Sequence, residues 1–225
     1  MCMFKSMLLL KDKVFCPNYD SHEDMINETG MEHGPMRENF VRVEITPPDD
    51  DLTVPIDKWK YKVDQDYLPE WYVEEVDKPR CFDALKAWAV KHILVGQDVP
   101  EVKQGEFVVL VNCNTGIVKG TVQEVLGGTV QEVWDGGTVQ KVWDGGTVQE
   151  VWGGGTVQKV WGGGTVQKVW DGGTVQKVWG GGTVQKVWGG GTVQKQTGGI
   201  VIYADGCISV CNKNFYRLIT PEEMK

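Results

Sequence analysis

A nine-residue unit with the consensus Thr-Val-Gln-Lys/Glu-Val-Trp-Asp/Gly-Gly-Gly recurs nine times between residues 120 and 198. The first two units are eight residues apart and every later pair is nine residues apart. Such a period is typical of a solenoid, in which each unit contacts only its neighbours in the stack. The units begin at Thr121, Thr129, Thr138, Thr147, Thr156, Thr165, Thr174, Thr183 and Thr192.

Each unit contains a β-favouring run of six residues, such as Thr138-Val139-Gln140-Lys141-Val142-Trp143, followed by a turn of Asp/Gly-Gly-Gly. Glycine adopts positive φ at little cost, so this triplet reverses the chain, and its density excludes a helix. We therefore predict a β-solenoid in which each strand pairs in parallel with its copy one coil later, at about 4.8 Å. Two units per coil are favoured, and three units per coil are the alternative.

The two valines of each unit are expected to point inward together. Strict alternation would instead place the first valine on the same face as Lys/Glu and Trp. Inward valines require an irregular, bulge-like step at the Gln-Lys pair, but they leave the variable Lys/Glu and Asp/Gly positions in water. The inner rows would then begin with Val122, Val130 and Val139, and with Val125, Val133 and Val142.

The tryptophans are expected on the outside or at the corners of the coils, in ladders whose rings half cover one another. Beside the Gln and Lys rows they form an amphipathic surface suited to stacking on sugar rings, docking a partner strand or self-association. The alternative is that they only thicken a thin valine core. The candidate binding residues are Trp134, Trp143, Trp152, Trp161, Trp170, Trp179 and Trp188.

Charge is distributed unevenly along the chain. Residues 1–119 carry 14 Lys/Arg against 22 Asp/Glu, whereas the array carries six Lys against three Glu and three Asp. A nucleic-acid-binding array would be expected to show a basic stripe, and a DNA-mimicking one an acidic stripe. The neutral array therefore predicts no nucleic-acid partner.

A cytoplasmic location is expected. The apolar stretch Met7-Leu8-Leu9-Leu10 is short and is followed by Lys11-Asp12-Lys13, unlike a secretory signal, and no stretch is long enough to span a membrane. The six cysteines form no dense disulfide framework, as in reduced cytosolic proteins.

The region before the array is predicted to be α+β. Residues 7–10 and 14–16 flank a polar turn and indicate a hairpin. Ser21, with Asp24 three residues later, is expected to cap a short helix that ends at Gly30.

Further along, residues 40–45 and 59–63 alternate as half-buried strands and are expected to be adjacent. Residues 68–72 indicate a helical turn, and Asp77-Lys78-Pro79 is expected to open a longer helix. Residues 107–111 are then expected to enter the solenoid as a buried strand. The apolar face of the longer helix contains Phe82, Leu85, Trp88 and Ala89.

Three segments carry a resemblance: residues 1–6 (Met-Cys-Met-Phe-Lys-Ser), 40–48 (Phe-Val-Arg-Val-Glu-Ile-Thr-Pro-Pro) and 63–72 (Val-Asp-Gln-Asp-Tyr-Leu-Pro-Glu-Trp-Tyr). They resemble a group of uncharacterised bacterial and phage proteins, many from gut communities. Those proteins combine an N-terminal module with eight- or nine-residue Ser/Thr-Val-x-x-Leu/Met repeats and a short β-rich tail. The resemblance implies apolar residues at both valine positions and variable residues at the Trp position, and it implies no activity.

Candidate chemical sites are few. Asp20, His22 and Glu23 form a possible acid/base cluster, but capping of the adjacent helix accounts for them. Cys2, Cys16, His22 and His33 lack the close paired spacing of a zinc site. No metal and no cofactor is predicted from these residues.

Two further groups invite comparison with known sites. Asp135, Asp144 and Asp171 occupy the turn position that calcium-binding nonapeptide rolls use, but four of the seven Trp-containing units have Gly there, so calcium is not expected. Residues Cys207, Ser209 and Cys211 alternate with Ile208 and Val210, as in a strand with small buried thiols.

The predicted fold is mainly β: an α+β module at residues 1–106, a β-solenoid at 107–198 and a short β-rich cap at 199–225. We expect a non-enzymatic scaffold for binding or self-assembly through the Trp/Gln/Lys surface, with a second copy or another protein as partner. The alternative places the function in the acidic N-terminal module, as a small enzyme or a phage-encoded inhibitor of a host factor, with the array as a spacer.

Overall fold

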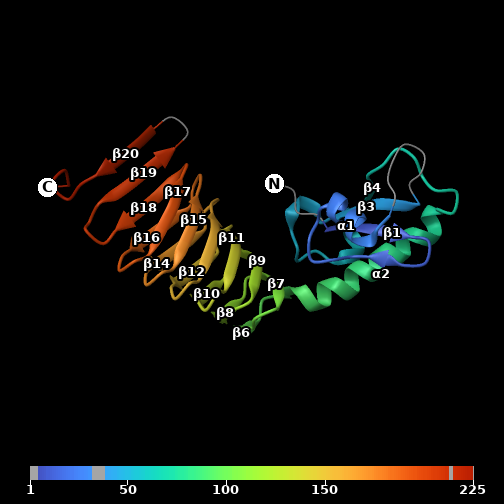
Figure 1. Ribbon diagram of the computed structural model, residues 1–225, viewed down its shortest axis with the longest axis horizontal. Helices are drawn as coiled ribbons and strands as arrows, with labels where there is room; N and C mark the ends of the chain where they lie inside the picture. The colour runs from blue at the N-terminus through green and yellow to red at the C-terminus, as the bar shows by residue number, and fades with distance from the viewer. Residues whose placement is uncertain (1–4, 32–38, 213–214, 225) are drawn as a thin grey trace. The chain divides into compact units, whose positions relative to one another are not determined.

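The computed structural model describes residues 5–31, 39–212 and 215–224 (Figure 1). The chain divides into two compact units, Met1–Lys91 and His92–Lys225. The first is α+β, and the second is built from stacked parallel strands followed by antiparallel ones. The mainly β fold class predicted from the sequence is confirmed.

The first unit contains a four-stranded antiparallel sheet in the order β2-β1-β3-β4. Its strands are β1 (Lys5–Leu10), β2 (Val14–Phe15), β3 (Phe40–Thr46) and β4 (Lys60–Val63). Every residue of β1 is buried, as expected of a central strand covered on both faces. The predicted hairpin and the predicted pairing of β3 with β4 are both confirmed.

Helix α1 (His22–Thr29) packs Met25 and Ile26 against a core that also contains Leu8, Leu10 and Phe40. The Ser21 side chain accepts a hydrogen bond from the Asp24 backbone N–H, and Gly30 ends the helix in the left-handed conformation. Both predicted ends of this helix are confirmed. Two 3₁₀ turns, η1 (Pro48–Asp50) and η2 (Ile56–Lys58), connect β3 to β4.

Helix α2 (Glu74–His92) begins earlier than predicted, because Pro79 lies inside it rather than at its start. The cause is Asp77, whose buried carboxylate accepts a hydrogen bond from the Val73 backbone N–H at 2.9 Å and pairs with Arg80 at 2.6 Å. This contact supplies an N-terminal cap one turn before the proline. Leu85 and Ala89 are buried on the predicted apolar face, while Phe82 and Trp88 are half-buried.

The second unit contains two sheets whose strands alternate along the chain (Figure 1). The seven-stranded sheet consists, in spatial order, of β17 (Thr192–Gln196), β15 (Thr174–Val178), β13 (Thr156–Val160), β11 (Thr138–Trp143), β9 (Thr121–Leu126), β7 (Phe107–Val111) and β5 (Ile93–Val95). The nine-stranded sheet consists of β20 (Phe215–Ile219), β19 (Ile208–Asn212), β18 (Gly199–Tyr203), β16 (Thr183–Val187), β14 (Thr165–Val169), β12 (Thr147–Val151), β10 (Thr129–Val133), β8 (Asn114–Val118) and β6 (Asp98–Val102).

Each unit of the array therefore supplies one strand, and two units complete one coil. Thr129 pairs with Thr147 and Thr138 with Thr156, so each strand lies beside its copy eighteen residues later. The prediction of two units per coil is confirmed, and the three-unit alternative is excluded by this register.

Both valines of each of the first eight units point into the core. From Val122 to Val178 they are 0 to 1% exposed, and they form one continuous cluster. The pairing within the array joins Thr and both valines to their copies and leaves out the Gln, which marks the irregular step that inward valines require. The predicted inner rows are confirmed.

The turns also follow the prediction. The two residues after each array tryptophan except Trp179 have positive φ, as at Asp135 (53°) and Gly136 (79°), and in all seven turns the next glycine donates its N–H to the Trp carbonyl. This is the pattern of a type I′ turn, in which Asp tolerates the left-handed region better than most residues. The exchange of Asp for Gly at this position therefore leaves the backbone path unchanged.

The coils extend beyond the repeat at both ends. They begin at Ile93, before the expected boundary at residue 107, because β5 and β6 pair in parallel with β7 and β8. They end with β18, which pairs in parallel with β16 and then continues into the antiparallel strands β19 and β20. The tail thus prolongs the nine-stranded sheet, whereas the seven-stranded sheet ends at β17.

Candidate functional site

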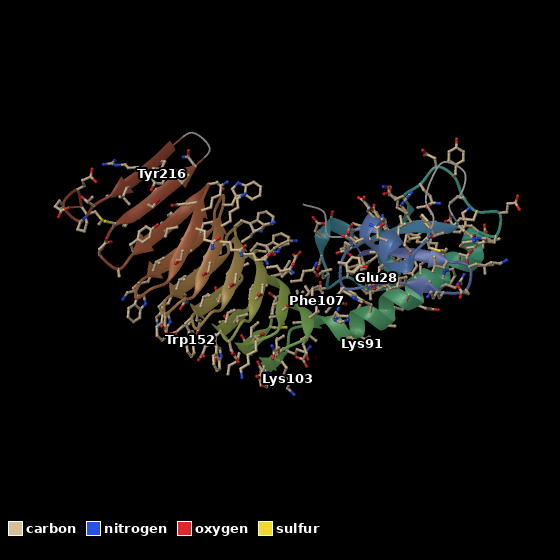
Figure 2. All side chains as sticks on the ribbon, in the orientation of Figure 1. Glu28, Lys91, Lys103, Phe107, Trp152 and Tyr216 are labelled. Atoms are coloured by element: carbon tan, nitrogen blue, oxygen red, sulfur yellow. The ribbon has the colours of Figure 1, made fainter. Side chains whose placement is uncertain are left out.

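The tryptophans form two ladders, one after the strands of each sheet. Trp134, Trp152, Trp170 and Trp188 follow the nine-stranded sheet, with successive ring centroids 5.0, 5.5 and 5.5 Å apart and interplanar angles of 4°, 17° and 14°. Trp143, Trp161 and Trp179 follow the seven-stranded sheet, with centroids 4.9 and 6.2 Å apart. These distances match offset stacking of indole rings. Figure 2 labels Trp152 in the first ladder.

Inside each ladder, neighbouring rings cover both faces of each indole ring. An interior ring has a neighbour on both sides, and its side chain is half-buried. The indole N–H groups of Trp134, Trp152 and Trp170 are buried without a hydrogen-bond partner. The interior of the first ladder therefore presents neither free faces nor accessible donors, which argues against the stacking of sugar rings along it.

Charged groups lie at the N-terminal end of both ladders. The Lys119 ammonium lies 4.8 Å from the ring centroid of Trp134. The buried Glu124 carboxylate accepts hydrogen bonds from the Trp143 indole N–H at 2.8 Å and from the Lys141 ammonium at 2.6 Å. These contacts hold the first ring of each ladder in place.

The C-terminal end of the array is more open. Trp179 and Trp188, the last rings of the two ladders, are 44% and 42% exposed. Among the strands that the structure describes, the neighbouring strand β17 is paired only with β15. Its last residue, Gln196, replaces the inward valine and bonds to the Ser209 backbone oxygen of the tail at 3.1 Å. The exposed rings and the edge of β17 together define the surface that we call the array end.

In the first unit, Asp20, His22 and Glu23, which were considered as an acid/base cluster but interpreted as part of a helix start, have separate surroundings. Asp20 pairs with the buried ammonium of Lys5 at 2.6 Å and accepts the Ser6 backbone N–H at 3.2 Å. Glu23 is exposed in the first turn of α1. Asp20 is thus a structural partner of Lys5, and the interpretation of this segment as a helix start holds.

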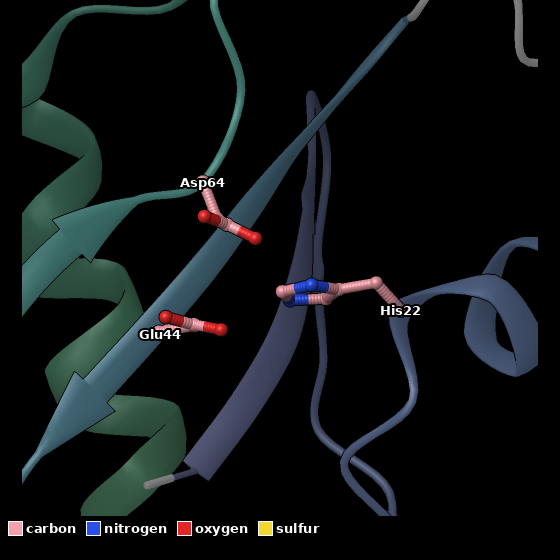
Figure 3. A group of neighbouring side chains, drawn as sticks. All are labelled: His22, Glu44 and Asp64. Carbon is pink, nitrogen blue, oxygen red and sulfur yellow. The ribbon is translucent and has the colours of Figure 1, made fainter.

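His22 instead meets two carboxylates that sequence reasoning missed. His22 begins α1, Glu44 lies on β3 and Asp64 follows β4, and one ligand atom from each lies within 4.8 Å of the others (Figure 3). The only sequence signal for this cluster was the alternating pattern of β3 and β4, which predicts that the two strands pair and is consistent with Glu44 lying opposite Lys62. The position of α1 over that face depends on tertiary packing.

Lys62 forms ion pairs with both carboxylates of this cluster. Its ammonium lies 2.7 Å from Asp64 Oδ1 and 3.4 Å from Glu44 Oε2, and its side chain is 61% exposed. The hydrogen bond from Lys62 lowers the pKa of Asp64, and the same contact raises the pKa of Lys62. Both groups are therefore charged at neutral pH.

The cysteines are poor candidates for nucleophiles or metal ligands. Burial raises the pKa of Cys16 to about 11 and that of Cys81 to about 12, so both thiols are protonated at neutral pH. Cys2 and His33, which were considered with Cys16 and His22 as metal ligands, lie outside the described residues. The predicted strand is present as β19, with Cys211 inside it and Cys207 just before it, but both thiols are half-buried rather than buried, and only Ser209 is buried.

No protein-family model, no curated protein and no solved structure matches this chain. Within the described residues, no helix is long and apolar enough to cross a membrane.

Proposed function

We propose that this protein is a non-enzymatic scaffold whose β-solenoid assembles with a second copy through the array end. The observation that carries the proposal is the outer edge of β17: among the described residues no strand pairs with it there, and the tail, which contacts β17 through Gln196 and Ser209, adds its strands only to the nine-stranded sheet. An edge strand presents unpaired backbone N–H and C=O groups, which another strand can complete. The two most exposed rings of the ladders lie in the last coils beside it.

A second copy fits this edge better than an unrelated chain. The array pairs its units with one another along its whole length, so β17 is already shaped to accept a unit of the same kind. In an antiparallel β17 pair centred on Gln194, Val193 would lie opposite Lys195, and no two lysines would face each other.

The test measures molar mass by sedimentation equilibrium over a wide concentration range. We expect a concentration-dependent dimer. Gln194→Lys, which places two like charges at the centre of the pair, should weaken it at least tenfold, or about 1.4 kcal/mol. Trp188→Ser should weaken it as well, because it removes apolar area from the array end.

Gln158→Lys is the matched control, since it makes the same change on β13, where both edges of the strand are already paired. It should leave the mass distribution unchanged. A protein that stays monomeric at every concentration would remove the support for the proposal, as would a dimer that Gln194→Lys and Gln158→Lys affect equally.

A further inference from the structure

We propose that His22, Glu44 and Asp64 form a binding site for one divalent first-row transition-metal ion of the zinc type. The three side chains come from three different elements of the first unit, and Figure 3 shows them directed toward a common point. This inference concerns the first unit alone and does not depend on assembly through the array end. It departs from the prediction from the sequence, which considered His22 with Cys2, Cys16 and His33 and expected no metal.

The donor set suits this class of ion. An imidazole nitrogen and two carboxylate oxygens bind zinc at about 2.0–2.2 Å, so the three atoms need only approach from their present separation of up to 4.8 Å by small side-chain rotations. A set of pure oxygen donors would favour calcium or magnesium, whereas an imidazole shifts the preference to zinc, cobalt and their neighbours. Three protein ligands leave further positions to water.

The Val43 carbonyl can serve His22 as the outer hydrogen-bond partner that metal-bound histidines use. The His22 Nε2 lies 3.2 Å from the Val43 carbonyl oxygen, which can only accept, so Nε2 carries the proton in this hydrogen bond. The neutral ring then has its free lone pair on Nδ1. A ring N–H held by a backbone carbonyl is the usual outer partner of a metal-ligating histidine, and it fixes both tautomer and orientation.

Lys62 is the competitor for the site. Its ammonium already lies between the two carboxylates, which indicates that the position favours a cation. Exposed ion pairs of this kind are weak, and the long Lys62 side chain can turn into solvent when a divalent ion enters. Removing this competitor is therefore expected to tighten metal binding, whereas removing any of the three ligands weakens it.

The experiment titrates the untagged full-length protein with Zn²⁺ by calorimetry and with Co²⁺ by visible absorption. We expect one ion per chain at this site. His22→Ala, Glu44→Gln and Asp64→Asn should each weaken binding at least tenfold, and Lys62→Met should tighten it several-fold. Glu23→Gln is the matched control, because it removes a carboxylate next to His22 in sequence but outside the cluster.

Circular dichroism of each variant verifies that the first unit is folded. The NMR chemical shifts of the His22 ring report directly whether Zn²⁺ binds to it. The free thiols of Cys207 and Cys211 provide the competing ligands. A cobalt-to-thiolate charge-transfer band that persists in His22→Ala would overturn the proposal. So would binding that Glu23→Gln weakens as much as Glu44→Gln, or no binding of either ion.

Discussion

Replacing Gly155 with alanine is expected to destabilise the array by about 3 kcal/mol or more, because the new methyl group has no space. A Cβ at this buried position would lie 2.0 Å from the Val133 carbonyl oxygen and 2.5 Å from its carbon. Those atoms belong to the preceding coil of the same sheet, where the carbonyl accepts the Trp152 N–H. The methyl group therefore forces adjacent coils apart and breaks the ladder between them.

The control is Gly153→Asp, two residues earlier in the same turn. Gly153 has a φ of 51°, and Asp occupies the equivalent position in three other units with φ between 42° and 53°. Its nearest non-local atom would be 3.8 Å away, so we expect a change within about 0.5 kcal/mol. Thermal unfolding together with hydrogen exchange of β12 to β14 measures both effects. Equal stability of the two variants would contradict the close packing of the coils.

Asp20→Ala is expected to destabilise the first unit by about 3–5 kcal/mol, because it leaves the Lys5 ammonium buried without its carboxylate. Lys5 is 3% exposed, and its other contacts are the backbone oxygens of Ser6 and Tyr19 and the ring of Trp88. Carbonyl oxygens satisfy its hydrogen bonds but do not neutralise its charge. Denaturant unfolding followed by tryptophan fluorescence measures the loss.

The double variant Lys5→Met/Asp20→Ala separates this explanation from a general loss of packing. Removing both charges should recover much of the stability lost in Asp20→Ala, since an apolar side chain can occupy the buried position without a partner. A double variant less stable than Asp20→Ala would show that Lys5 is not the cause. His22 and the metal-binding cluster are unchanged in either protein.

The sequence predicted the array in detail because one local pattern is repeated. Two polar residues separate Val139 from Val142, the first eight units all share this pattern, and the same solution must serve all of them. If a side-chain orientation or a turn type does not fit one unit, it does not fit any of the coils, because the units are nearly identical. The inward valines and the positive φ at Asp135 and its equivalents agree with this constraint, whereas the repetition favoured two units per coil without excluding three.

The start of the solenoid was missed because its first coils lack the consensus. Strands β5 to β8 contain Pro100, Phe107 and Asn114 in place of repeat residues. A signal was nevertheless present: Val99 and Val102 have the same three-residue spacing as the two valines of a unit, and Thr115 and Val118 repeat it. Both pairs align with array valines in the nine-stranded sheet.

The remaining differences depend on contacts distant in sequence or on buried charges. The start of α2 is set by the hydrogen bond that the Val73 backbone N–H donates to the Asp77 carboxylate. The preference of proline for the first turn of a helix therefore predicted too late a start. The His22 cluster requires α1, β3 and β4 to converge, and no periodic pattern records that arrangement. The sequence predicts a row of Trp side chains but does not show which ring faces their neighbours cover. The stacking distances show that the interior rings have no free face for a ligand.

The coil of eighteen residues is the central structural claim, since the two Trp ladders, the covered ring faces and the open edge at β17 all follow from it. Disulfide formation between introduced cysteines tests it directly. Lys159 pairs with Lys177 in adjacent strands, and such strands are separated by about 4.8 Å, within the range that a disulfide spans. Mass spectrometry of digested protein identifies the linked peptides and separates them from links to the native cysteines.

We expect rapid cross-linking in Lys159→Cys/Lys177→Cys, and none in Lys159→Cys/Lys168→Cys or Lys159→Cys/Lys186→Cys. The pair nine residues apart lies in different sheets, and the pair twenty-seven residues apart would be adjacent only with three units per coil. A cross-link between positions 159 and 186, with none between 159 and 177, would contradict the two-sided coil and the proposals that rest on it.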